Sequence, residues 1–314
     1  MTRQRPPARR TRFTLLTLLL VCPPRAEAFG LNRQPTRWKK GGAIEFVVNM
    51  ANVPATLSQA QIVEVVRRAM EPWTQIPTAK LPFKVGPVTN DPSKTTPQAD
   101  RMNVIFWESG AAPRGDMFAG KAYPFPSECD ILIQPQAPYT LIDVRAIVIH
   151  ELGHCMGLAH STAHSVMTKF QGLPSLGSDD AIAVSLLYPN PEASLEETTA
   201  TITGQVKRHG KPLLGAVLRV VDRKTQRITV AGFSGLIDGQ RREAASGAFE
   251  LPGLPPGRYT LKIEPMDAFA AADPAGYGAP VDAPPAAFAP LSLDLPELAA
   301  GEAYDSGTLE VEDR

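Results

Sequence analysis

One eleven-residue run in this chain carries three histidines at a spacing that suits a metal ion. The run, residues 150–160, reads His-Glu-Leu-Gly-His-Cys-Met-Gly-Leu-Ala-His. On a helix, His150 and His154 lie one turn apart on the same face, so their imidazoles can share one tetrahedral zinc ion. Gly157 lets the helix end in a left-handed turn, which can bring His160 back as a third ligand. Three protein ligands leave the fourth position for water, which predicts a catalytic rather than a structural zinc.

Glu151 lies next to the first predicted ligand but is rotated about 100° from it around the helix. Its carboxylate can therefore reach a water on the metal without taking a coordination position. This predicts Glu151 as a general base that activates that water. The alternative is a buried helix with three satisfied histidines. It is disfavoured because three of the five histidines in the chain fall at ligand spacing.

The extended motif His-Glu-x-x-His-x-x-Gly-x-x-His resembles that of the metzincin zinc endopeptidases, and further details resemble the matrixin branch. Ser161 follows the third histidine, as in matrixins. Residues 165–167, Ser-Val-Met, resemble the Met-turn, which implies that Met167 forms an apolar floor beneath the zinc. Residues 178–188 resemble the last matrixin helix, which begins with an acidic pair and ends near Leu-Tyr.

The resemblance covers roughly residues 38–190 and implies a secreted, zinc-dependent endopeptidase. Its implied fold is an α+β catalytic domain of the metzincin type, a twisted mixed sheet plus the active-site helix. Its implied chemistry is hydrolysis of peptide bonds by a zinc-activated water, with Glu151 as general base and one catalytic zinc held by His150, His154 and His160. His164 and Tyr188 lie nearby in sequence as candidate donors to the oxyanion, although a plain loop position is the simpler reading of His164.

Several departures separate this chain from the animal matrixins. No histidine precedes His150, so their structural zinc site cannot be transferred, and calcium sites stay unassigned. The inhibitory Pro-Arg-Cys-Gly run is absent. These departures place the chain with minimal, bacterial matrixin-like proteins.

Two other functions remain as alternatives. One is a silent or latent zinc-containing binding or adhesion protein that acts through the C-terminal half, and the other is a hydrolase of non-peptide amides. The intact Glu151 argues against the first.

Residues 1–28 are typical of a secretory signal peptide. A basic stretch precedes a short apolar run, and Ala-Glu-Ala at 26–28 predicts cleavage before Phe29. An uncleaved interfacial anchor and a lipoprotein site at Cys22 are alternatives.

The remaining chain carries 26 basic and 31 acidic residues, which argues against a nucleic-acid partner. We therefore expect a secreted or periplasmic monomer that acts on protein or peptide substrates and has no membrane span.

Two cysteines remain after the predicted cleavage site. Cys155 lies on the active-site helix and Cys129 lies before the strand at 130–133. In an exported protein they can form a disulfide that clamps the helix to the sheet, or they can be two buried thiols.

Hydrophobic periodicity predicts the elements that position this site. A helix starts after Ser58, where Gln61 completes a capping box, and the active-site helix starts after Thr140, with Asp143 in the same role. Strands are predicted at 43–48, 81–88, 103–107 and 131–133. Residues 120–124 correspond by resemblance to the edge strand above the cleft, which can bind an extended peptide, although an ordinary surface loop is the alternative.

The C-terminal half has a different composition from the first. Residues 191–200 are predicted to be a linker between a catalytic domain at 29–190 and an all-β sandwich at 201–314. Residues 253–261, Gly-Leu-Pro-Pro-Gly-Arg-Tyr-Thr-Leu, resemble carboxypeptidase regulatory-like, transthyretin-like domains. Residues 268–290 are rich in Ala and Pro and are expected to form a long loop.

Overall fold

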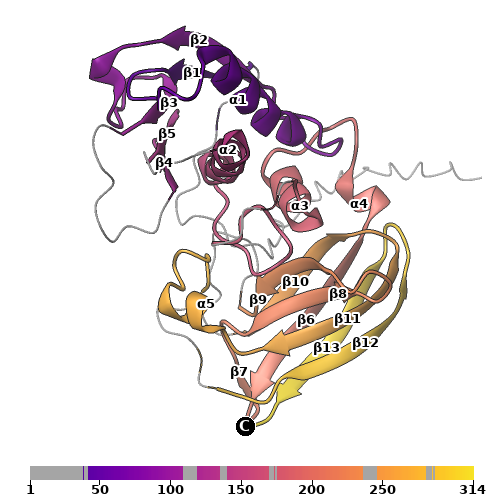
Figure 1. The fold of residues 1–314 in the computed structure, drawn as a ribbon. Helices are drawn as coiled ribbons and strands as arrows, with labels where there is room; N and C mark the ends of the chain where they lie inside the picture. Colours follow the sequence, from indigo (N-terminus) through magenta and orange to yellow (C-terminus); the bar gives the residue numbers. More distant parts are fainter. Residues whose placement is uncertain are drawn as a thin grey trace, which may run out of the picture.

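The first half of the described chain is a five-stranded sheet with two helices packed against it (Figure 1). The computed structural model describes residues 38, 42–108, 119–134, 140–169, 173, 175–235, 246–280, 285 and 287–314, so the predicted signal peptide lies outside the described residues. The elements of this half are β1 (Ile44–Asn49), α1 (Gln59–Thr74), β2 (Phe83–Thr89), η1 (Pro92–Lys94), β3 (Asn103–Trp107), β4 (Gly120–Pro124), β5 (Cys129–Ile133), α2 (Leu141–Met156) and α3 (Ser178–Leu187).

The sheet has the strand order β2-β1-β3-β5-β4. Four strands are parallel, and β4 alone runs antiparallel, pairing with β5 as an edge strand. Alternate residues of β3 face opposite sides, as the period of a strand requires. Ile105 and Trp107 join the core under the helices, and Val104 and Phe106 join a smaller cluster on the other face. The mixed sheet expected from the sequence is confirmed.

Both helices begin with the capping boxes expected from the sequence. Ser58 and Gln61 cap α1, and Thr140 and Asp143 cap α2. The buried face of α1 consists of the residues with helical spacing, namely Ile62, Val65, Val66, Ala69, Met70 and Trp73. The indole Nε1 of Trp73 donates to the carbonyl oxygen of Ile149 at 3.1 Å, which fixes α1 against the helix that carries the histidines.

The second half consists of two four-stranded sheets that share one core. One sheet has the order β10-β6-β13, with β7 paired to β6, and the other has the order β12-β11-β8-β9. Pairing is antiparallel except between β6 and β13. The bounds are β6 (Ala200–Arg208), β7 (Lys211–Pro212), β8 (Val217–Asp222), β9 (Ile228–Phe233), β10 (Ala248–Leu254), β11 (Gly257–Glu264), β12 (Leu291–Leu298) and β13 (Ala303–Val311). The all-β architecture expected for this half is confirmed.

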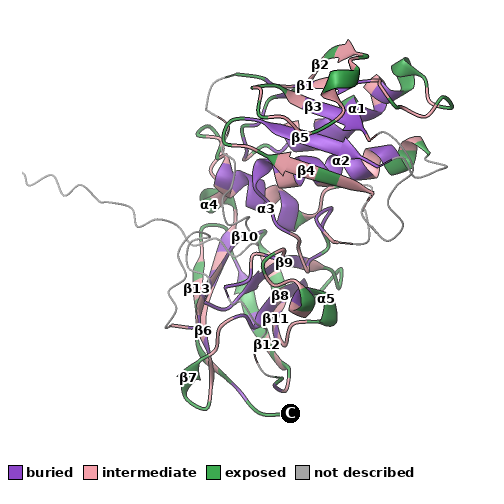
Figure 2. Cartoon of the chain, turned by 90° about the vertical axis from the view of Figure 1, so that its left-hand side faces the viewer, coloured by how far each residue is buried: buried purple, intermediate pink, exposed green. Residues whose placement is uncertain are grey.

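The two halves are packed together through α3 (Figures 1 and 2). Buried side chains of both halves form one continuous apolar cluster, and α3 contacts β9 directly. The segment predicted to be a linker contains a one-turn helix, α4 (Leu195–Thr198), whose Leu195 packs against this cluster. The long loop expected at 268–290 contains another short helix, α5 (Ala268–Ala272). Among the described helices, none is both long and apolar enough to cross a membrane.

Candidate metal centre

Three histidine side chains converge at the C-terminal end of α2. One ring nitrogen from each of His150, His154 and His160 lies within 4.8 Å of the others. Their ring centroids are 4.7 Å apart for His150 and His154, 4.9 Å for His154 and His160, and 5.5 Å for His150 and His160. In the part of the chain that the structure describes, this is the one cluster of three or more residues suited to a metal ion.

The end of α2 brings the third histidine back to the first two. Gly157 follows the helix with φ of 104°, a left-handed conformation that a side chain would strain. The amide of Leu158 then donates to the carbonyl of Gly153, which closes the turn. His160 leaves this turn toward the other two histidines, as the motif predicts.

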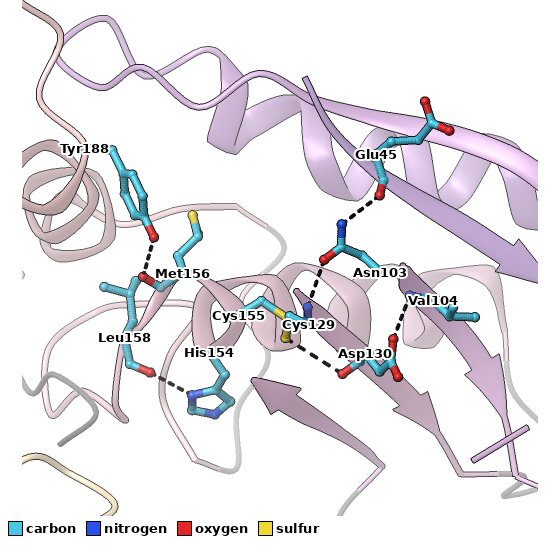
Figure 3. Close-up of a disulfide and its surroundings, with 10 residues drawn as sticks. All are labelled: Glu45, Asn103, Val104, Cys129, Asp130, His154, Cys155, Met156, Leu158 and Tyr188. Carbon is cyan, nitrogen blue, oxygen red and sulfur yellow. Dashed lines mark hydrogen bonds between the residues drawn. A yellow bond between two sulfur atoms is a disulfide. The ribbon is translucent and has the colours of Figure 1, made fainter. Parts of the chain in front are cut away.

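Backbone carbonyls hold two of the three rings. The Nδ1 of His150 lies 2.7 Å from the carbonyl oxygen of Val166. The Nδ1 of His154 lies 2.8 Å from the carbonyl oxygen of Leu158 (Figure 3). Because a carbonyl can only accept, each Nδ1 carries the proton, and the other nitrogen is left as a metal ligand. The Nδ1 of His160 is buried and has no hydrogen-bond partner among the described residues. This donor set fits a zinc ion.

The surroundings keep the three imidazoles neutral, which is the form that binds zinc. Burial lowers the pKa of His150 and lowers that of His154 well below its ordinary value. Burial also lowers the pKa of His160 to about 4, and His150 and Lys169 act in the same direction.

Glu151 lies beneath the edge strand β4. It is only 6% exposed, and a Cβ at Gly120 of β4 would lie 3.2 Å from its Cγ. Burial raises the pKa of Glu151 to about 8, while the backbone of Ala122 and the charge of Lys121 oppose the rise. The carboxyl group next to the first histidine is therefore desolvated and faces the strand at the edge of the sheet.

Met167 lies directly against α2 at Gly153, which stands between His150 and His154 in the sequence. A side chain on Gly153 would collide with the sulfur of Met167. The turn that carries Met167 is held by Asp180, which accepts hydrogen bonds from the hydroxyl of Ser165 and, at 2.9 Å, from the amide of Val166. The amide of Ser161 donates to the carbonyl of Met167 at 3.0 Å. The methionine turn is thereby tied to the residue that follows the third histidine.

Cys129 and Cys155 form a disulfide, with Cα atoms 5.6 Å apart (Figure 3). Cys129 begins β5, and Cys155 lies in the last turn of α2, next to His154. Of the two alternatives from the sequence, the structure supports the disulfide, which connects the histidine-bearing helix to the sheet.

The two other residues near the motif do not join this cluster. Tyr188 donates its hydroxyl to the carbonyl of Met156 at 3.0 Å, so it supports the end of α2 (Figure 3). His164 is exposed in the loop after the third histidine. No sequence pattern marks Gly153 as the contact of Met167, and the acidic pair expected to begin the last helix did not predict the buried contacts of Asp179. The latter is buried and accepts hydrogen bonds from Ser161 at 2.7 Å and from the amide of Ala231 at 2.9 Å.

The three histidines and the methionine turn lie within a segment whose sequence matches a known family. Residues 89–189 match the matrixin family. This segment is a matrixin domain. The chain is therefore a metalloendopeptidase, a hydrolase that acts on peptide bonds, and the three histidines of the matrixin domain form its zinc site. No curated protein sequence matches the chain.

Solved structures give only distant likenesses. Archaemetzincin from Methanopyrus kandleri is 19% identical over 48% of this chain and 91% of its own, with a TM-score of 0.27. Archaemetzincin from Archaeoglobus fulgidus is 17% identical over 47% and 96%, with a TM-score of 0.24. A 9R-lipoxygenase from Cyanothece is 21% identical over 38% and 17%, with a TM-score of 0.18. At these TM-scores the likenesses add nothing to the family match.

Proposed function

We propose that this chain is a secreted zinc endopeptidase in which Glu151 is the general base. The observation that carries the proposal is the placement of Glu151, which follows the first zinc ligand on α2 and is buried under β4. A carboxylate whose pKa is raised by burial is a better proton acceptor than one in water. The three histidines lie on the same helix and on the turn that follows it, so the base and the metal share one rigid support.

The mechanism divides the work between the metal and the side chains. Zinc, when bound, polarises the scissile carbonyl and lowers the pKa of a water molecule. Glu151 accepts a proton from that water and passes it to the leaving amine nitrogen. Val166 and Leu158 hold the rings of His150 and His154 in one tautomer through their carbonyls. Met167 supplies an apolar floor against the helix at Gly153.

The substrate would bind in extended form along β4. This strand forms the free edge of the described sheet, and Glu151 lies beneath it. An extended peptide can add to such an edge through its backbone groups, which tolerates many side chains. The substrate class is therefore protein or peptide.

We also propose the domain limits and the location. Residues 1–28 act as signal peptide, 29–190 as the catalytic domain, 191–200 as the connection and 201–314 as a sandwich of the carboxypeptidase regulatory-like type. Matrixins are generally extracellular, and the disulfide between Cys129 and Cys155 suits an extracytoplasmic compartment. The protein then acts as a secreted or periplasmic monomer.

Cleavage of casein and of a peptide library by residues 29–314 tests the proposal, with bound zinc measured in parallel. We expect cleavage that a chelator removes and that zinc restores. Glu151→Gln should abolish cleavage while zinc stays bound, because the carboxyl is not a ligand. Glu71→Gln, which alters an exposed ion pair with Arg67 on α1, is the matched control and should cleave normally.

Two results would contradict this proposal. Cleavage by Glu151→Gln at a rate near that of the unmodified enzyme would remove Glu151 from the role of base. One zinc per chain with no cleavage of any peptide would favour the silent or latent binding protein instead.

A further inference from the structure

A loop of the C-terminal sandwich lies against the third zinc ligand. The loop, residues 267–279, includes α5 and is called the sandwich loop below. The backbone amide of His160 donates to the carbonyl oxygen of Gly276 at 2.9 Å. The ring of Tyr277 lies 5.5 Å from the ring of His160, centroid to centroid, and Tyr277 is only 5% exposed. The surroundings of His160 therefore come partly from outside the matrixin domain.

Asp273 fixes the sandwich loop to the matrixin domain. Its Oδ2 accepts an ion-pair hydrogen bond from Lys169 at 2.9 Å, and its Oδ1 accepts the amide of Gly276 at 3.0 Å. Lys169 comes two residues after Met167. Its side chain is 15% exposed and that of Asp273 is 41% exposed, so water screens the ion pair from one side only. One carboxylate thus holds the turn at Gly276 and joins it to the methionine turn.

Tyr277 is held from the other side by the sandwich. It belongs to a small buried cluster with Val217, Phe233, Ala270 and Ala279. Val217 and Phe233 are paired residues of β8 and β9. The aromatic ring next to His160 therefore has a rigid base in the sandwich.

The ring of His160 is held differently from the other two rings. Zinc-bound histidines generally donate their second ring nitrogen to a carbonyl, carboxylate or water, which fixes the ring. His150 and His154 have carbonyl partners of this kind, whereas the Nδ1 of His160 is buried without one among the described residues. The groups of the sandwich loop that contact His160 are the carbonyl of Gly276, which accepts its backbone amide, and the ring of Tyr277.

We propose that Asp273, Gly276 and Tyr277 are positioning residues for the zinc ligand His160, so that the C-terminal sandwich is part of the zinc site. The inference deepens the proposed peptidase function. It assigns the sandwich a role in holding the metal, in place of the role of a spacer or of a separate binding module.

The test measures zinc affinity in the full chain by competition with a chromophoric chelator. We expect Tyr277→Ala and Asp273→Ala to weaken zinc binding by about 10- to 100-fold, the usual cost of losing a group that orients a metal ligand. Asp273→Asn should lose less, because its remaining oxygen still accepts the Gly276 amide. Tyr277→Phe keeps the ring and should bind zinc like the unmodified chain.

Matched controls separate this effect from a general loss of sandwich stability. Tyr304→Ala on β13 and Asp294→Ala on β12 alter the same residue types away from the sandwich loop, and should leave zinc affinity unchanged. Cobalt substituted for zinc gives a second readout, since its ligand-field absorption reports the geometry of the three histidines. We expect that spectrum to change in Tyr277→Ala and not in Tyr304→Ala.

Unmodified zinc affinity and an unmodified cobalt spectrum in both Tyr277→Ala and Asp273→Ala would overturn the inference. If Tyr277→Ala does not fold, Asp273→Ala and Lys169→Met decide the question, because they change the loop attachment and leave the buried cluster intact. The zinc readout needs no turnover. If the unmodified chain cleaves no peptide but the variants lose zinc affinity, this inference is supported and the proposed function is refuted. If the unmodified chain cleaves peptides but the variants keep their zinc affinity, the proposed function is supported and this inference is refuted.

Discussion

The sulfur of Met167 occupies the space that a side chain on Gly153 would need. Gly153 lies between the two histidines of α2, and Met167 lies on the turn after the third histidine. The lack of a Cβ at one position therefore lets the methionine reach the backbone of the helix that carries His150 and His154. This contact adds to the hydrogen bond between His150 and the carbonyl of Val166, which also joins these two segments.

Gly153→Ala should displace Met167 and weaken zinc binding. The added methyl group overpacks a buried contact, which lowers stability by about 1–3 kcal/mol. The higher helix propensity of Ala than of Gly raises stability by about 1 kcal/mol, so the substitution lowers stability overall wherever the overpacking cost exceeds that gain. We expect a lower free energy of unfolding in denaturant for the zinc-free protein, together with a lower zinc affinity.

A double-mutant cycle checks the cause. Met167→Ala removes the side chain that the new methyl group meets, so Gly153→Ala should cost less in that background. Equal costs of Gly153→Ala in both backgrounds would show that the contact with Met167 is not responsible.

Reduction of the disulfide between Cys129 and Cys155 should destabilise the protein by about 2–4 kcal/mol, because the bond closes a loop with a sequence separation of 26. It also ties the last turn of α2 to β5, so zinc affinity should fall together with stability. The measurement compares denaturant unfolding with and without reductant. The variant Cys129→Ala/Cys155→Ala is the control and should show no response to reductant.

Asp179 should make stability depend on pH between about 4 and 7. Burial raises the pKa of Asp179 from 3.8 to about 7, and the negative charge of Asp180 also raises it. Hydrogen bonds from Ser161 and from the amide of Ala231 lower it in part. The folded chain thus holds this proton more tightly than the unfolded chain does. The stabilisation is fully present below about pH 4 and is lost as the pH rises through about 7.

Asp179→Asn should therefore flatten the pH dependence of unfolding by on the order of a few kcal/mol across this range. The measurement is urea unfolding of the zinc-free protein at several pH values, which keeps metal binding out of the comparison. Asp294→Asn, at an exposed aspartate of β12, should follow the unmodified chain. Identical pH profiles for all three proteins would mean that Asp179 titrates normally in the folded state.

Tyr188→Phe should lower stability by about 1 kcal/mol and leave kcat/KM unchanged. The hydroxyl donates to the carbonyl of Met156, so its loss removes one hydrogen bond at the end of α2 and nothing from the reaction. Denaturant unfolding measures the change in stability, and peptide cleavage at saturating zinc measures kcat/KM. A large fall in kcat with zinc still bound would instead assign Tyr188 to transition-state stabilisation.

The sequence allowed the local parts of this fold to be predicted well. Ser58 and Gln61 predicted the start of α1 because a capping box depends on residues three apart, and the buried face of α1 followed from its apolar spacing. The convergence of His150, His154 and His160 was predictable for the same reason, since one helix and one left-handed turn bring them together.

Contacts between distant segments were not predictable from those patterns. Lys169 and Asp273 are 104 residues apart, and neither residue has a local signal for the other. Asp179 and Ala231 meet across the packing of α3 on β9, which amphipathic spacing does not specify. The short helix α5 appeared as an Ala- and Pro-rich loop because five residues are too few to show a period.

The attachment of the sandwich loop also imposes an order in time. A chain is made from its N-terminus, so His150, His154 and His160 all emerge before Gly276 and Tyr277 have been synthesised. During that interval a nascent chain holds every zinc ligand but lacks the carbonyl and the aromatic ring that lie against the third one. The metal site therefore acquires its final surroundings only after the chain has been synthesised as far as Tyr277, which is most of its length.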